Sequence, residues 1–264
     1  MGRIIVVASG KGGVGKTTLT ANLGIALAKK KKSVCVIDGD FGLNNLDSLL
    51  GLENRVVYDV FDILKGECRI SQGLVKDPIF NNLYMLASTK IESNRCVQIE
   101  DFKGLVMELE KVFDYCLIDA PAGLDFGFVR ALAPAGEMLV VVTPTVASIR
   151  DAVKCVSLAK SKNEIMVNVV VNRVRWNLIS LGEMLSVQDI EELINEKVIG
   201  VVPENGELLV GNTLKGIMQE NNDIVAIFDL LADNLIHNRY VIADGTKKIR
   251  GIWGGFFKKR KEAI

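Results

Sequence analysis

The chain has 264 residues, of which 49% are hydrophobic and 24% charged, a composition that excludes both a disordered chain and an integral membrane protein. Its 32 basic and 32 acidic side chains balance, but they are not evenly distributed. Residues 247–264 contain seven basic side chains and one acidic side chain, a net charge of +6, so residues 1–246 carry −6. This asymmetry indicates a mildly acidic body with a basic appendage.

Cysteine and histidine usage limits the possible metal sites and the compartment. Five cysteines, an odd number with no C-x-x-C pair, predict neither a disulfide framework nor a zinc site and favour a reducing compartment. The single histidine, His237, excludes a multi-histidine metal site and is expected on the surface or in helix packing. The first apolar run, Ile4–Ala8, is too short for a signal peptide or a membrane span, so we expect a cytoplasmic protein.

Short runs rich in Val and Ile alternate along the chain with longer amphipathic segments. The expected strands are Ile4–Ala8, Val34–Ile37, Tyr115–Ile118, Met138–Val142, Met166–Val171 and Val198–Val201. The expected helices are Thr17–Lys31, Phe102–Lys111, Arg150–Lys160, one that begins at Ser186 with Asp189 completing a capping box, and Ile224–Asn238. Continuous apolar strands are typical of a sheet covered on both faces, which predicts an α/β fold with a doubly wound, mainly parallel sheet.

The first expected strand leads into a phosphate-binding motif. The string that matches G-x-x-x-x-G-K-[ST] is Gly10, Lys11, Gly12, Gly13, Val14, Gly15, Lys16 and Thr17. Glycines let backbone N–H groups approach phosphate oxygens, and the start of the following helix adds unpaired donors and a positive dipole. We expect Lys16 to reach the β- and γ-phosphates and the Thr17 hydroxyl to bind Mg²⁺. A chance glycine-rich turn is the alternative, and the strand–loop–helix context argues against it.

Aspartates end two of the expected strands. Asp38 and Asp40 follow the second strand, and Asp119 follows Tyr115–Ile118. Ligands bind outside the carboxyl ends of parallel strands, so these carboxylates are expected to face the nucleotide. We predict Asp119 and Asp38 as metal-shell residues and Asp40 as the residue that orients the attacking water, because phosphoryl transfer depends on positioning and charge neutralisation. An N-cap or loop role remains the alternative for each aspartate taken alone.

The whole string from Lys11 to Thr18 resembles the deviant Walker A motif of the MinD/ParA class of P-loop ATPases, which have the SIMIBI-type fold. In that class the early lysine crosses a nucleotide-sandwich homodimer to the partner's phosphates, which implies this role for Lys11. The resemblance also implies ATP and Mg²⁺ as cofactors, adenine contacts from Asn172, Arg173 and Pro203, and a place near the dimer surface for Asp151. Without the resemblance, these four would be ordinary loop or helix-start residues.

Longer strings resemble the MinD family within this class. They are Asp38–Asp47, Gly51–Val60, Gly66–Arg69 and Asn82–Leu86. The resemblance implies division-site placement, recruitment of a MinC-like division inhibitor and stimulation by a MinE-like regulator. Gly39 departs from the usual alanine, which we expect to make that loop more flexible. The segment Ala120–Gly123 has no cluster cysteine, so the related nitrogenase iron protein is excluded.

The basic tail has the pattern of an interfacial helix. Its apolar residues follow i, i+3, i+4, i+7, i+8 spacing and are Ile249, Ile252, Trp253, Phe256 and Phe257. We predict that this amphipathic helix binds an anionic membrane surface reversibly, on the inner face of the cell membrane. Three glycines within the segment each cost about 1 kcal/mol of helix propensity, so it should fold only on lipid. A helix docked on the protein's own core is the alternative.

The predicted organisation is a P-loop ATPase domain at residues 1–240, a linker at 241–246 and the membrane-targeting tail at 247–264. Two other functions within the class remain open: a flagellar-number regulator of the FlhG type, and a ParA-like DNA-partitioning ATPase. The Gly51–Val60 string disfavours the first. The aromatic stripe of the tail disfavours nucleic acid as the partner.

Overall fold

The computed structural model describes residues 2–42, 45–88, 97–162, 164–209, 223–243 and 257–258. Its strands are β1 Arg3–Ala8, β2 Val34–Asp38, β3 Leu74–Lys76, β4 Leu83–Leu86, β5 Tyr115–Asp119, β6 Glu137–Val142, β7 Met166–Val174, β8 Lys197–Pro203, β9 Ile242–Ala243 and β10 Phe257–Lys258. Its helices are α1 Lys16–Lys29, α2 Leu46–Leu50, the 3₁₀ helix Glu53–Arg55, α3 Val60–Leu64, α4 Ile70–Gly73, α5 Ile99–Glu110, α6 Phe126–Leu132, α7 Val146–Lys162, α8 Trp176–Ser180, α9 Val187–Ile194, α10 Gly206–Leu209 and α12 Asp223–His237.

The described strands form one large sheet in the order β3-β4-β2-β5-β1-β6-β7-β8. All neighbours pair in parallel except β3, which runs antiparallel to β4 at one edge. The predicted doubly wound, mainly parallel α/β fold is therefore confirmed. The two strands β9 and β10 pair separately as an antiparallel ribbon.

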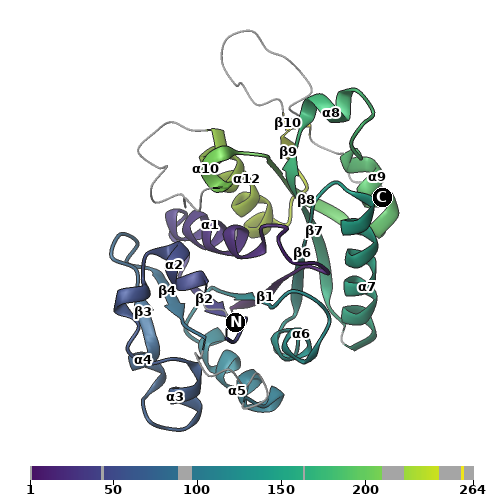
Figure 1. The fold of residues 1–264 in the computed structure, drawn as a ribbon. Coiled ribbons are helices and arrows are strands. Elements are labelled where there is room, and N and C mark those ends of the chain that lie inside the picture. Colours follow the sequence, from purple (N-terminus) through teal and green to yellow (C-terminus); the bar gives the residue numbers. More distant parts are fainter. Residues whose placement is uncertain are drawn as a thin grey trace.

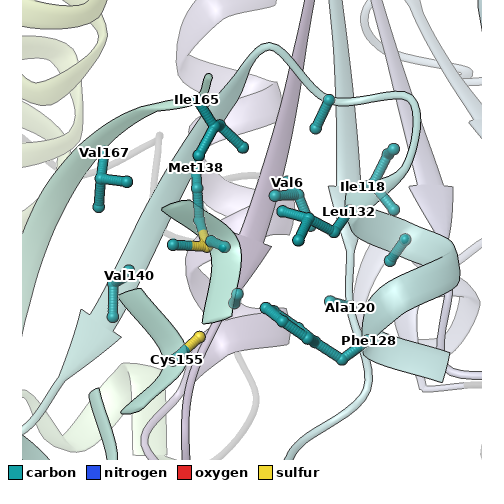
Figure 2. Close-up of a cluster of buried hydrophobic side chains, with 14 of the residues drawn as sticks. Val6, Ile118, Ala120, Phe128, Leu132, Met138, Val140, Cys155, Ile165 and Val167 are labelled. Atoms are coloured by element: carbon teal, nitrogen blue, oxygen red, sulfur yellow. The ribbon is translucent and has the colours of Figure 1, made fainter. Parts of the chain in front are cut away.

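Helices cover both faces of the sheet, and Figure 1 shows α1 and α12 on one side and α5, α6 and α7 on the other. Both faces of the sheet are apolar and are buried by helices, as strand β1 illustrates: its successive side chains alternate between the two hydrophobic clusters. Ile4, Val6 and Ala8 belong to the cluster beneath α5, α6 and α7. Ile5 and Val7 belong to the cluster beneath α1 and α12. Figure 2 shows part of the first cluster, in which Phe128 and Leu132 of α6 lie with Val6 of β1 and Ile118 of β5.

Most predicted elements are confirmed, with changed ends. The helix expected from Thr17 begins one residue earlier, at Lys16, and ends at Lys29. The Ser186 capping box is present: the Ser186 hydroxyl accepts from the Asp189 N–H and the Asp189 carboxylate accepts from the Ser186 N–H. His237 is the exposed last residue of α12, as expected.

Two strands at one edge of the sheet are absent from the strands that the sequence predicts: β4, which lies within the family string Asn82–Leu86, and β3. Each has four residues or fewer, too few to show a clear hydrophobic period. Part of the expected linker, Ile242–Ala243, is strand β9.

Most of the tail lies outside the described residues, including Ile249, Ile252, Trp253 and Phe256 of the predicted amphipathic helix. Phe257 is described and lies in β10, opposite Ala243 of β9; because the tail is expected to become helical only on lipid, the amphipathic helix stays a prediction. Among the described residues, none of the helices combines the length and the apolar character needed to cross a bilayer.

Candidate nucleotide-binding site

The P-loop connects β1 to α1 at the carboxyl edge of the sheet. Gly13 and Gly15 have φ of +77° and +92°, which residues with a Cβ rarely adopt. A Cβ on Gly15 would also lie 2.3 Å from Nδ2 of Asn172, so glycine is required there for space as well. Gly15 is the N-cap of α1 and, because glycine has no side chain, it caps none of the first N–H groups of the helix. The loop therefore presents free backbone donors and a helix dipole, as an anion site requires.

Lys16 and Asp119 form a buried ion pair at the centre of the site. Their Nζ and Oδ1 atoms are 2.8 Å apart, and their side chains are 7% and 2% exposed. The Thr20 hydroxyl, one turn further along α1, lies 3.2 Å from the same Asp119 oxygen. The structure thus brings together the predicted phosphate lysine and the predicted metal carboxylate, which are 103 positions apart in sequence.

Asp38 and Asp119 are directly opposite each other, because β2 and β5 pair in a register that matches these two residues. The pKa of Asp38 is raised to about 7, first by burial and then by the nearby Asp119 carboxylate, against backbone hydrogen bonds that lower it. One of these bonds runs from the Asp40 N–H to Asp38 Oδ1, at 3.0 Å. The pKa of Asp40 is also raised, first by burial, with Lys16 acting in the opposite direction.

The Asp38–Asp119 pair suits a hard divalent cation. Both side chains supply oxygen and both are buried, and the Asp119 carboxylate raises the pKa of Asp38. In phosphate sites Mg²⁺ takes one or two carboxylates and completes its shell with water and phosphate oxygens. Within the described part of the chain no group of three or more His, Cys, Asp or Glu side chains forms a metal site. The residues present, with the Thr17 hydroxyl, therefore fit a nucleotide-bound Mg²⁺ and not an all-protein cage.

A pocket of about 150 Å³ lies beside the P-loop. Its lining residues are Gly15, Thr18, Leu19, Asn172, Arg173, Val202, Pro203, Asn205, Leu208 and Phe228. The three residues that the family resemblance assigned to adenine are all among them. The predicted position of two of them differs: Asn172 and Arg173 lie inside β7 and not after it, and Pro203 is the last residue of β8. The β7–β8 ladder continues past a register shift, which lengthens both strands.

Asn172 also contacts the P-loop directly. Its Nδ2 donates to the carbonyl of Val14 at 2.8 Å. Arg173 has φ of +59°, and the Arg173 N–H donates to Asn172 Oδ1 at 2.9 Å. One side chain thus joins the base pocket to the phosphate loop.

Lys11 is exposed on the P-loop, and its carbonyl accepts from the Ser9 hydroxyl at 2.8 Å. Asp151, at the surface of α7, lies against the start of the loop, since a Cβ on Gly10 would be 2.3 Å from the Asp151 carbonyl oxygen. Both residues thus lie at the start of the P-loop, outside the buried centre of the site.

Gly39 has a role that differs from the expected flexibility. Its N–H donates to the Asp119 carbonyl at 2.9 Å, and a Cβ at this position would lie 2.9 Å from the same oxygen. Gly39 therefore permits a close approach of the loop after β2 to β5.

Sequence reasoning missed Arg130 and Phe41. Arg130 is 1% exposed and lies on α6, with its Cζ 3.8 Å from the centre of the Phe41 ring. Burial lowers the pKa of Arg130 to about 10, and the carboxylates of Asp125 and Asp40 oppose the decrease. A single arginine in a short apolar segment gives no signal of burial in the sequence, so nothing there could have found it.

Comparisons with known proteins show the family of the chain. The model of the CobQ/CobB/MinD/ParA nucleotide binding domain matches residues 5–210. The septum site-determining protein MinD of Synechocystis sp. is 45% identical over 83% of this chain and 84% of its own length. A chain of the MinC:MinD cell division protein complex of Aquifex aeolicus superposes with a TM-score of 0.81 and 40% identity, over 89% of this chain and 96% of that one.

A further solved structure is the septum site-determining protein MinD of Pyrococcus horikoshii, complexed with Mg-ADP. It has a TM-score of 0.78 and 26% identity, over 89% of this chain and 96% of that one. The P-loop geometry, the buried carboxylates and the extent of these matches agree, and the chain belongs to the MinD family of CobQ/CobB/MinD/ParA nucleotide-binding proteins.

Proposed function

We propose that the protein is a Mg²⁺-dependent ATPase whose ATP-bound form is a membrane-associated homodimer that acts in placing the division site. The observation that carries this proposal is the cluster of Lys16, Asp119, Asp38 and Asp40 at the mouth of a P-loop beside a base-sized pocket. The names of the relatives, septum site-determining proteins and a MinC:MinD complex, support the division role.

The chain's own residues account for binding. Backbone N–H groups of the P-loop and of the first turn of α1 bind the phosphates, and Lys16 exchanges its contact with Asp119 for a phosphate oxygen. That exchange leaves Asp119 free to act with Asp38 and Thr17 as a holder of Mg²⁺. The metal, when bound, neutralises the charge that develops on the phosphate oxygens. Asn172, Arg173 and Pro203 hold adenine.

Hydrolysis then depends on Asp40. The Asp40 N–H donates to Asp38, which holds the Asp40 backbone, and Lys16 is near enough to lower the pKa of the Asp40 carboxylate against the effect of burial. Asp40 accepts a hydrogen bond from the attacking water and orients the water in line with the γ-phosphate; positioning of this kind supplies most of the rate enhancement in phosphoryl transfer.

Dimerisation couples the nucleotide to the membrane. Lys11, exposed at the open face of the site, contacts the phosphates of the second copy in the ATP state. Each basic side chain near an anionic surface contributes about 1 kcal/mol, so a single short tail binds weakly and reversibly. Two tails on one dimer bind far more tightly because the second binds intramolecularly. Hydrolysis, stimulated by a MinE-like regulator, separates the copies and releases them, and the ATP dimer recruits a MinC-like inhibitor.

The test combines a mass measurement with a membrane assay. Light scattering with ATP, under conditions of slow turnover, should give the mass of two chains, and with ADP the mass of one. In co-sedimentation, vesicles containing anionic phosphatidylglycerol should retain the intact chain with ATP but not with ADP.

Two controls define what would contradict the proposal. The chain truncated after residue 246 should still dimerise with ATP but fail to sediment with vesicles. A single-chain mass with both nucleotides would refute dimerisation, and vesicle binding by the truncated chain would refute the tail. Retention on non-specific DNA that depends on ATP and survives truncation would favour a partitioning protein.

A further inference from the structure

Helix α6 has two different faces, and one of them contacts the loop after β2, which contains Asp40 and Phe41 and is called the catalytic loop below. Phe128 and Leu132, four residues apart, lie in the core cluster beneath the sheet (Figure 2). Phe126 and Arg130, also four residues apart, share a different face. The Arg130 guanidinium lies 5.7 Å from the Phe126 ring centre and 3.8 Å from that of Phe41, in the loop after β2.

Phe41 directly follows Asp40, so the ring that stacks on Arg130 belongs to the residue next to the predicted water-orienting carboxylate. Phe41 is 4% exposed and is held from another side by Phe102 of α5, in an edge-to-face contact at 5.9 Å. The loop is thus clamped between α5 and α6 at one residue. A displacement of Phe41 must carry Asp40 with it, because the two share a peptide unit.

The same helix is tied to the loop after β5. The Asp125 side chain caps α6 by accepting from the Gly127 N–H at 3.1 Å. A Cβ on Gly127 would lie 2.7 Å from Cγ of Pro121, two residues after Asp119. Helix α6 therefore touches both loops whose aspartates define the phosphate site.

Burying an arginine at this position carries a large desolvation free energy. An apolar side chain of similar volume would pack against Phe41 without the cost of removing a guanidinium from water, and such replacements are often neutral or stabilising. Stacking on aromatic faces in a fixed plane, with charge retained, is what distinguishes arginine from the alternatives.

We propose that Arg130 is a positioning residue for hydrolysis: through its stack on Phe41 it holds Asp40 in place and couples the loop after β2 to the loop after β5. The inference rests on the proposed ATPase function and on the role of Asp40 in it. Arg130 acts on the chemical step and not on nucleotide affinity, because it stacks on Phe41 beside Asp40 and is not among the residues that line the pocket.

The test measures steady-state ATPase kinetics of the full chain with Mg²⁺, together with nucleotide affinity and thermal unfolding. Arg130→Met, which keeps the volume, should lower kcat by about 10- to 100-fold, the effect of a small misplacement of a catalytic group. KM and nucleotide affinity should stay close to those of the unchanged protein. Arg130→Lys, which keeps the charge but loses the planar stack, should recover only part of kcat.

Phe41→Leu gives a second measurement that does not depend on removing a buried charge. It should lower kcat in the same way, and combining it with Arg130→Met should lower kcat little further, because both changes break the same contact.

Arg3→Met is the matched control. Arg3 is a half-buried arginine that also lies over an aromatic ring, that of Tyr115 at 5.4 Å, but it is at the start of β1, at the edge of the sheet opposite the P-loop. It should lower thermal stability and leave kcat unchanged.

The outcomes distinguish a failure of the proposed ATPase function from a failure of the positioning role of Arg130. If the unchanged protein does not hydrolyse ATP, or if Asp40→Ala hydrolyses it normally, the proposed function or the role of Asp40 fails. If both behave as proposed but Arg130→Met and Phe41→Leu keep kcat, the positioning role is refuted. A loss of kcat that is matched by an equal loss of nucleotide binding or of folded protein would also refute it.

Discussion

Buried carboxylates dominate the site at the scale of single residues. Asp38 and Asp119 are 2% and 1% exposed and lie in register on adjacent strands. Burial and the neighbouring Asp119 carboxylate both disfavour the ionised form of Asp38, so without a cation an ionised Asp38 carries an electrostatic cost. Lys16 offsets this cost on the Asp119 side. The site is therefore built to gain stability when a divalent cation and a nucleotide arrive.

The pH dependence of stability should reveal this cost. With nucleotide and metal removed, Asp38 releases its proton near pH 4 in the unfolded chain but at about pH 7 in the folded protein. Between these values the folded state binds more protons than the unfolded state, so the free energy of unfolding falls as pH rises from 4 to 7. Asp38→Asn should weaken this decline and raise stability at pH 8, as measured by thermal unfolding.

Asp77→Asn is the control for that measurement. Asp77 is equally buried at 2% but lies after β3, where its carboxylate accepts from the N–H groups of Ile79 and Phe80. It should lower stability without altering the decline between pH 4 and 7. A decline of unchanged size in Asp38→Asn would show that Asp38 is not its source.

At the scale of elements, the site depends on how β7 meets the P-loop. Asn172 near the end of β7 donates to Val14 and occupies the space beside Gly15 that a Cβ would fill. The base pocket and the phosphate loop thus share one side chain, so a change in either alters the other. Local sequence at Gly10–Thr17 defines the loop, but a strand that begins more than 150 positions later holds it.

Asn172→Ala should weaken ATP binding by about 3- to 10-fold, the equivalent of one hydrogen bond of about 1 kcal/mol, and by more if adenine also loses a partner. The measurement is the affinity for a fluorescent ATP analogue. Asn82→Ala is a matched control: Asn82 donates to the carbonyls of Ala28 and Lys32 at the opposite end of the sheet. It should lower thermal stability but leave the affinity unchanged, and equal effects of the two variants on affinity would contradict the role of Asn172.

At the scale of the whole molecule, the P-loop opens to one side, where Lys11 is exposed and Asp151 borders the loop. A lysine that serves its own site would be drawn inward, as Lys16 is at 7% exposure. The two lysines of one loop therefore have different environments, which fits different tasks: Lys16 within the chain and Lys11 across a dimer.

Lys11→Ala should remain a single chain in light scattering with ATP while it still binds nucleotide, because its own phosphate contacts are kept. Lys103→Ala removes another exposed lysine, from α5 on the far side of the sheet, and should dimerise normally. Dimerisation of Lys11→Ala with ATP would contradict the role across the interface.

The sequence by itself determined the parts of this protein that depend on local chemistry. The P-loop follows from glycine conformations and spacing, the main strands from continuous Val and Ile runs, and the helix at Ser186 from its capping box. Asp38, Asp40 and Asp119 could be predicted together because parallel strands bring their carboxyl ends to one edge.

Only the tertiary structure decided which side chains meet. The pair of Lys16 with Asp119, the bridge from Asn172 to Val14 and the stack of Arg130 on Phe41 each join segments distant in sequence. Short strands such as β3 form because a neighbour offers hydrogen bonds, and Phe257 is extended because β9 lies beside it. Local propensity is weak in such segments, so long-range pairing and burial decide their conformation.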